Sequence, residues 1–196
     1  NLQRAEEIGL KALAITEHGN EYSWCYYDKL HEKYPNIKLI FGVEFYECFD
    51  MTEQNKDSKY FHLIVLAKNE NGRKAINQLV TDSNFHGFYY KPRIDLNALK
   101  PYAKDLVVSS ACLASKLARE PDYQKCVEYV REYKEIFPHF YLEMQSHSHQ
   151  DQMVYNQKIL QLSVDTNTPY IITTDSHAAR KEDLYYQNWH VKLAHD

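Results

Sequence analysis

Short apolar segments alternate with helical patterns along this chain, and this alternation restricts the fold more than any other feature. The strand-like segments are ALAIT (12–16), KLIFGVEFY (38–46), FHLIVLA (61–67), DLVVSS (105–110), FYLEM (140–144) and YIITT (170–174). Six strands separated by helices are typical of an α/β fold with a largely parallel sheet. Strands that are apolar on both faces favour a barrel wrapped by helices.

The segments between these strands carry helical spacing or breaks. Helices are expected over 21–34, over 71–83, from Pro121 onward, over 150–166 and over 180–194. Residues 47–59 are polar and predict a loop. The stretch 85–104 contains two prolines and predicts irregular structure.

Ionisable residues lie at the ends of these strands. His18, Glu44 and Cys112 end or follow their strands, and so do Asp175 and His177. In β/α barrels the functional groups gather at the C-terminal strand ends, so we expect these five side chains on one rim.

His62 is the exception, because it opens its strand rather than ending it. It reaches the same rim only if 61–67 runs antiparallel to 38–46, joined by the 47–59 loop. We adopt that arrangement as a hypothesis, and it adds His62 to the rim as a sixth group.

Imidazole, carboxylate and thiolate groups together suit Zn²⁺, or Mn²⁺ and Fe²⁺ where carboxylates and histidines dominate. A carboxylate such as Glu44 can bridge two ions. Two or three neighbouring ions can clamp a phosphate, activate a water molecule and stabilise the leaving oxygen. The pattern therefore indicates a multi-metal site that hydrolyses phosphoesters.

Each residue also has a simpler interpretation. His18 alone could be a hydrogen-bonded structural histidine, Glu44 a salt-bridged barrel residue, and Cys112 a small buried hydrophobe. Asp175 and His177 form the most specific pair, because residues two apart in an extended chain point to the same side.

Two further groups of residues have competing interpretations. Lys91 and Arg93 flank Pro92 in GFYYKPRID, and Arg is well suited to bidentate phosphate binding. The alternative for this pair is a solvated basic turn. His147 and His149 form a His-x-His, for which an exposed loop is the favoured interpretation.

Composition limits the classes of function. The formal net charge of −4 argues against a basic surface that coats nucleic acid, although metal ions could still hold a DNA end. The four cysteines are scattered and are expected to be reduced, intracellular thiols. We find no signal peptide and no apolar run long enough to span a bilayer, so no membrane partner is expected.

Several segments resemble, in order, the PHP (polymerase and histidinol phosphatase) domain of bacterial DNA polymerase III alpha subunits. They are ALAITEHGN, FGVEFY, HLIVLAKNENG, GFYYKPRID, LVVSSACLAS, FYLEMQSH and TTDSHAARKEDL. GFYYKPRID and SSACLAS are the most specific. A cysteine at position 112, where the phosphatase branch commonly has histidine, also favours the polymerase branch.

The resemblance implies a distorted seven-stranded β/α barrel of the TIM-like PHP type, with up to three divalent ions. The family ligand positions match His18, Glu44, His62, Cys112, Asp175 and His177. Such domains serve either as metal-dependent 3′–5′ exonucleases or as structural platforms. The implied partners are the rest of the polymerase chain, a DNA 3′ end and a proofreading subunit, in the bacterial cytoplasm.

The chain also departs from the family pattern. The family's first motif, a His-x-His strand, is not found, so we expect residues 1–196 to be a single PHP-like domain truncated at both ends, with fewer ions. Glu17 replaces the usual Asp in TEHGN. Whether this segment is an enzyme stays open, and the alternatives are a non-catalytic scaffold, a free-standing phosphatase or a module with one structural zinc.

Overall fold

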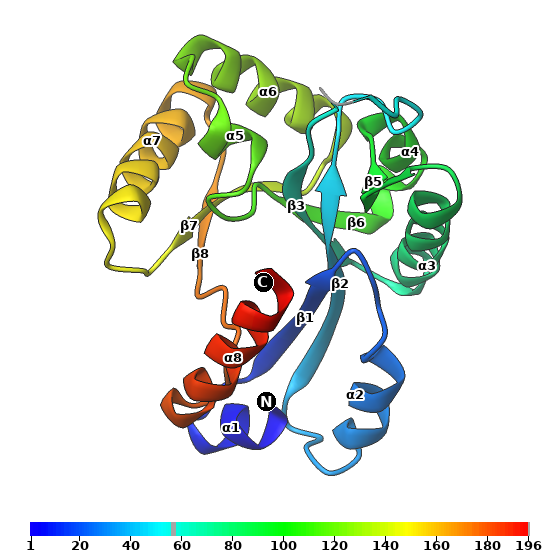
Figure 1. The fold of residues 1–196 in the computed structure, drawn as a ribbon, viewed down its shortest axis with the longest axis vertical. Helices are drawn as coiled ribbons and strands as arrows, with labels where there is room; N and C mark the ends of the chain where they lie inside the picture. Colours follow the sequence, from blue (N-terminus) through cyan, green and yellow to red (C-terminus); the bar gives the residue numbers. More distant parts are fainter. Residues whose placement is uncertain (56–57, 196) are drawn as a thin grey trace.

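The computed structural model describes residues 1–55 and 58–195. Its strands are β1 Ala12–His18, β2 Lys38–Glu47, β3 Phe61–Ala67, β4 Phe88–Tyr89, β5 Lys91–Ile94, β6 Leu106–Ser109, β7 Phe140–Gln145 and β8 Tyr170–Thr173. They form one sheet in the order β4-β5-β2-β3-β6-β7-β8, with β1 also paired to β2. The sheet curls into a half-barrel with helices around it (Figure 1), which confirms the expected distorted β/α barrel.

Most neighbouring strands run parallel. β1 and β5 are parallel to β2, and β6, β7 and β8 are parallel to one another. β3 is antiparallel to both β2 and β6. The hypothesis that 61–67 reverses direction beside 38–46 is therefore confirmed, and His62 enters its strand at the rim where β2 ends.

The helices follow the expected order. Their bounds are α1 Leu2–Glu7, α2 Trp24–His31, α3 Glu70–Phe85, α4 Leu96–Leu99, α5 Lys116–Arg119, α6 Tyr123–Ile136, α7 Gln150–Thr166 and α8 Leu184–His195. Two 3₁₀ turns, Lys100–Asp105 and Lys181–Asp183, precede β6 and α8. The helix expected from Pro121 begins at Tyr123, because the Asp122 side chain caps it by accepting the backbone N–H groups of Gln124 and Lys125.

The prediction that 85–104 is irregular was wrong. This stretch contains a tight hairpin, β4–β5, and β5 pairs with the end of β2 through Tyr46 opposite Arg93. Asp95 then caps α4 by accepting the Ala98 N–H. Strands of two and four residues are too short to show a periodic pattern. The expected loop after β2 is found in its described part, and residues 56–57 of it lie outside the described residues.

The hydrophobic core lies around β2, β3 and β6. Val43, Phe45, Val65, Leu106 and Val108 are fully buried there. Helix α3 packs against β3 and β5, while α7 packs against β7. Burial of these apolar side chains is the main source of stability and holds the rim at the end of β2 in a fixed position.

The strand β8 is much less buried than the centre of the sheet. Ile172 is 67% exposed and Tyr170 is also exposed. Among the described strands, β8 pairs only with β7. An ion pair between Arg180 and Glu7 joins the segment after β8 to α1, with 2.6 Å between Nη2 and Oε1.

Candidate metal centre

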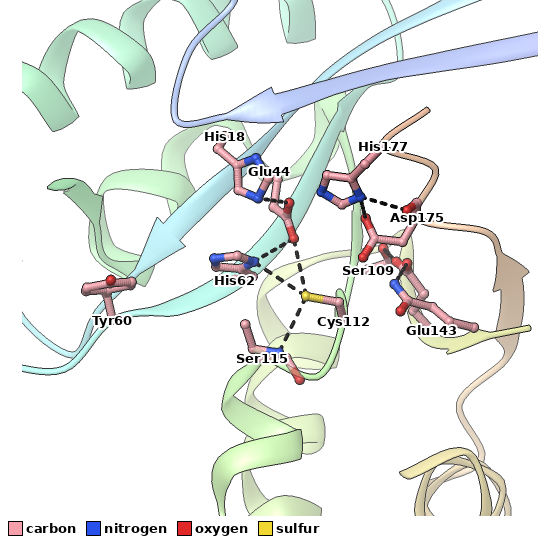
Figure 2. A network of polar contacts seen from close by, with 12 residues as sticks. His18, Glu44, Tyr60, His62, Ser109, Cys112, Ser115, Glu143, Asp175 and His177 are labelled. Atoms are coloured by element: carbon pink, nitrogen blue, oxygen red, sulfur yellow. Dashed lines mark hydrogen bonds and ion pairs between the residues drawn. The ribbon is translucent and has the colours of Figure 1, made fainter. Parts of the chain in front are cut away.

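Glu44 lies at the middle of a polar cluster on the rim. The parallel register of β1 and β2 places His18 directly beside it. His18 Nε2 lies 3.0 Å from Glu44 Oε2, and His62 Nδ1 lies 2.8 Å from Glu44 Oε1. Glu44 is only 4% exposed. Its carboxylate faces the two imidazoles rather than solvent (Figure 2).

The turn after β1 explains why glycine follows His18. Gly19 has φ +65°, and its N–H donates to the Glu44 carbonyl oxygen at 2.9 Å. A Cβ at this position would lie 2.9 Å from Pro92 Cγ and 3.0 Å from the Tyr46 ring. The backbone therefore approaches β2 and the hairpin more closely than a side chain allows.

Glu17, which replaces the usual Asp, points to the start of α2. Its Oε2 accepts hydrogen bonds from the Ser23 N–H at 3.0 Å and from the Ser23 hydroxyl at 2.8 Å. The Glu17 carboxylate thus joins the end of β1 to Ser23, the residue before α2.

Cys112 joins the cluster from the loop after β6. Its Sγ lies 3.4 Å from His62 Nδ1 and 3.6 Å from Glu44 Oε1. Ala111 before it adopts φ +57°, and the His62 N–H donates to the Ala114 carbonyl oxygen at 3.1 Å. The left-handed conformation of Ala111 and the hydrogen bond between Ala114 and His62 together hold the Cys112 thiol against the carboxylate and the imidazole.

Asp175 and His177 approach from the segment after β8. Asp175 has φ +45°, and His177 Nδ1 lies 3.8 Å from Asp175 Oδ1. The His177 ring centroid is 5.9 Å from that of His18. All six predicted residues thus lie around one part of the rim, with Asp175 and His177 facing the other four from the segment after β8 (Figure 2).

The charges in this cluster are coupled. Burial alone would raise the pKa of Glu44, but hydrogen bonds from His18 and His62 outweigh burial and lower that pKa to about 2. The same hydrogen bond to Glu44 raises the pKa of His18. Burial, with the Glu44 charge beside it, raises the pKa of Cys112 to about 12. A metal ion would therefore compete with protons on the histidine and on the thiol.

The donor set fits a divalent metal ion. One ligand atom from each of His18, Glu44 and His62 can be chosen so that all three lie within 4.8 Å of one another. The Cys112 thiol adds a soft donor beside them. Imidazole, carboxylate and thiolate are the ligands of protein zinc sites, and imidazole with carboxylate also suits Mn²⁺ and Fe²⁺.

Sequence reasoning missed another buried carboxylate near Asp175, that of Glu143 on β7. It accepts hydrogen bonds from the Ser109 hydroxyl at 2.5 Å and from the Thr173 hydroxyl at 2.6 Å. Burial raises the pKa of Glu143, and the nearby Asp175 adds to this shift. Its signal in the sequence was a lone acidic residue inside the apolar segment FYLEM.

The two predicted phosphate-binding residues have different environments. Arg93 is 0% exposed, and its guanidinium donates to the carbonyl oxygens of Gly87 at 3.1 Å and Glu53 at 2.6 Å. A longer contact of 3.4 Å reaches the Met51 carbonyl. Arg93 is therefore buried and held by backbone carbonyl groups, so this structure gives no support to a phosphate contact by its guanidinium.

Lys91 remains close to the cluster. Its Nζ lies 5.3 Å from the centroid of the Tyr46 ring, which in turn contacts the rings of His18 and His62. The positive charge of Lys91 partly opposes the rise in the pKa of His18. His147 and His149 stack on each other, and the exposed position of His149 agrees with the loop interpretation.

Comparison with known proteins adds a second line of observation. The family model described as "PHP domain" matches residues 1–147. Proteins named DNA polymerase III subunit alpha from Treponema pallidum and Aquifex aeolicus are 32% and 35% identical, over 95% and 94% of this chain. The chain spans about 17% of the length of each. Within the described residues, no helix is both long and apolar enough to cross a membrane.

Proposed function

The chain belongs to the PHP domain family, and from this premise we propose that it is the PHP domain of a bacterial replicative DNA polymerase with a metal-dependent phosphoesterase centre. The proposed substrate is the 3′ end of a DNA strand. The proposed partners are the rest of the polymerase chain and a proofreading subunit, in the bacterial cytoplasm. Residues 1–196 act as one domain in this proposal.

One observation supports the proposal most strongly. The Glu44 carboxylate lies within 3.0 Å of two imidazoles that come from different strands, with the Cys112 thiol beside it. An arrangement that served stability alone would not need a thiol and two histidines around one buried carboxylate. We propose His18, Glu44, His62 and Cys112 as one group of ligands, with Asp175 and His177 completing the centre.

Glu44 and Lys91 have different roles in this proposal. Glu44 stays anionic at neutral pH, because its pKa is lowered to about 2, and it orients both imidazoles. A divalent ion bound there would polarise a phosphodiester and lower the pKa of a water molecule. Lys91 would neutralise part of the phosphate charge at the side of the cluster near Tyr46.

A non-catalytic scaffold is a second candidate, and one observation favours it. Helix α8 exposes Tyr185, Tyr186, Trp189 and Leu193. An apolar surface of this kind is typical of a contact with another protein segment. A domain that serves to hold the polymerase together would need this surface and would not need phosphodiester hydrolysis.

One experiment separates the two candidates. The chain is loaded with Mn²⁺ or Zn²⁺, and release of nucleotides from the 3′ end of single-stranded DNA is measured beside metal content. Release that requires the metal and disappears in Glu44→Gln supports the phosphoesterase. Retained metal without release supports the scaffold, and a chain that binds no metal contradicts the proposed centre.

A further inference from the structure

A cavity lies beside the segment that carries His62, and the neighbouring Phe61 lines it. Its volume is about 580 Å³, which is in the range of small-ligand sites. Aromatic and basic side chains line it: Phe49, Lys59, Phe61, Lys116, Arg119 and Tyr129. The exposed Phe49 ring contacts the rings of Phe61 and Tyr129, with centroids 5.8 and 6.4 Å apart.

The start of β3 connects this cavity with the candidate metal centre. Successive side chains of an extended segment point to opposite sides. The His62 ring lies against Tyr46, as does the Tyr60 ring, whereas Phe61 lines the cavity. Arg119 Nη1 donates to the Tyr60 carbonyl oxygen at 3.4 Å, which joins the cavity wall to this segment.

The charges of the cavity leave a net positive wall. The ammonium group of Lys116 is buried, and its pair with Glu47, at 2.5 Å, neutralises it. Lys59 and Arg119 have no ion pair among the described residues, and both are exposed. Glu120 also lines the cavity, with its carboxylate accepting the Asp122 N–H at 3.0 Å. Two exposed basic side chains against one carboxylate, counted among the described lining residues, favour an anionic ligand.

We propose that this cavity binds an unpaired nucleotide of the DNA strand whose 3′ end lies at the metal centre. The inference rests on the proposed function and adds a second binding site to it. An exposed aromatic ring next to exposed basic side chains is the combination that holds single-stranded nucleic acid, through base stacking and phosphate contacts. Phe49 supplies the stacking face, and Lys59 and Arg119 contact the phosphates.

The test is direct binding of a fluorescein-labelled oligothymidylate to the chain in EDTA, followed by fluorescence anisotropy. Phe49→Leu keeps an apolar side chain but removes the ring, and we expect it to weaken binding at least about five-fold. Phe85→Leu is the matched control, because Phe85 is also an exposed phenylalanine and lies at the end of α3, where it does not line the cavity; we expect no change. Equal effects of the two substitutions would overturn the proposal.

The phosphate contacts are tested by salt dependence. We expect Lys59→Ala to reduce the slope of log Kd against log salt concentration by about 0.7, the value for one contact to a single strand. Lys29→Ala, an exposed lysine on α2, should leave the slope unchanged. An unchanged slope in Lys59→Ala would contradict the assigned contact.

A further probe identifies the ligand, and the choice of buffer separates the two proposals. An abasic strand of the same length should bind more weakly, and its binding should not respond to Phe49→Leu; equal binding of both strands would show an anion site only and overturn the nucleotide assignment. All of these binding measurements are made in EDTA, where the metal centre holds no divalent ion. The chain can bind oligothymidylate even if it proves to hold no metal ion. Conversely, a failure to bind oligothymidylate would leave the measured metal content and nuclease activity unaffected.

Discussion

The two halves of the candidate metal centre are built on parts of the sheet that differ in burial. His18, Glu44, His62 and Cys112, which we name the core half, contact one another directly beside the buried strands β2 and β3. Asp175 and His177, the edge half, follow β8, where Ile172 is 67% exposed. Packing therefore holds the strands β2 and β3 under the core half, although the His18 side chain itself is 41% exposed, whereas the edge half depends on a segment with little apolar support.

This difference has a physical consequence for metal binding. A ligand set that is already ordered loses little conformational entropy when an ion binds, while an exposed segment loses more. We expect the core half to supply most of the affinity. The edge half would complete the coordination and close the more open side of the centre.

The largest expected effect is on stability. Leu63→Ala in β3 removes a buried side chain and should lower the free energy of unfolding by about 2–5 kcal/mol. Ile172→Ala in β8 removes an exposed side chain and should change it by less than about 0.5 kcal/mol. Urea unfolding of both variants measures the two values. Equal losses would show that β8 is as tightly packed as β3.

The next effect is on zinc affinity. Replacing a residue that only hydrogen-bonds to a metal ligand typically weakens metal affinity about 10–100-fold. Loss of a direct ligand in the core half should therefore weaken it by about 100-fold or more. We expect His62→Ala to weaken zinc binding by about 100-fold and His177→Ala by about 10-fold. Competition with a chromophoric chelator measures both. A larger loss for His177→Ala would reverse the assignment of the two halves.

A smaller effect is expected from pH. The pKa of His18 is raised by its hydrogen bond to Glu44, so a proton occupies this ring at higher pH than in a free histidine. Below that raised pKa, each pH unit should weaken zinc binding about ten-fold more than it does above it, because the His18 proton must leave in addition to the proton of the Cys112 thiol. Chelator competition at a series of pH values between about 6 and 8 gives the slope. An affinity that does not change over this range would contradict the coupling.

Without metal, both His18 and Glu44 stabilise the fold, but their contributions depend on pH in opposite directions. The contribution of His18, whose pKa is raised, is complete below its ordinary pKa and is lost as pH rises through the raised value. The contribution of Glu44 is complete above its ordinary pKa and is lost as pH falls toward about 2. The metal-free pair therefore stabilises the fold most in mildly acidic solution, where metal binding is weakest.

The sequence predicted the rim because the rule about strand ends is local. His18, Glu44 and Cys112 each follow or end an apolar segment, and parallel strands bring such ends together. The reversed direction of β3 followed from requiring His62 to reach the same rim. Short elements such as β4, β5 and α5 gave no periodic signal and were missed for that reason.

The environments of Arg93 and Glu143 could not be read from local sequence. Two of the carbonyl groups that contact Arg93, those of Met51 and Glu53, lie 42 and 40 residues earlier in the chain. The partners of Glu143, Ser109 and Thr173, are 34 and 30 residues away. In both cases the packing of distant segments determines the role of the side chain. The local sequence around Arg93 or Glu143 carries no information about that packing.

Metal content per chain tests the central claim most directly. The unmodified chain and Glu44→Gln are loaded with zinc, freed of excess metal by gel filtration and analysed by mass spectrometry of the elements. Glutamine keeps the shape of the side chain but removes its negative charge, so we expect the unmodified chain to retain at least one ion and the variant to lose it. Equal zinc in both proteins, or none in either, would contradict a metal centre built around Glu44.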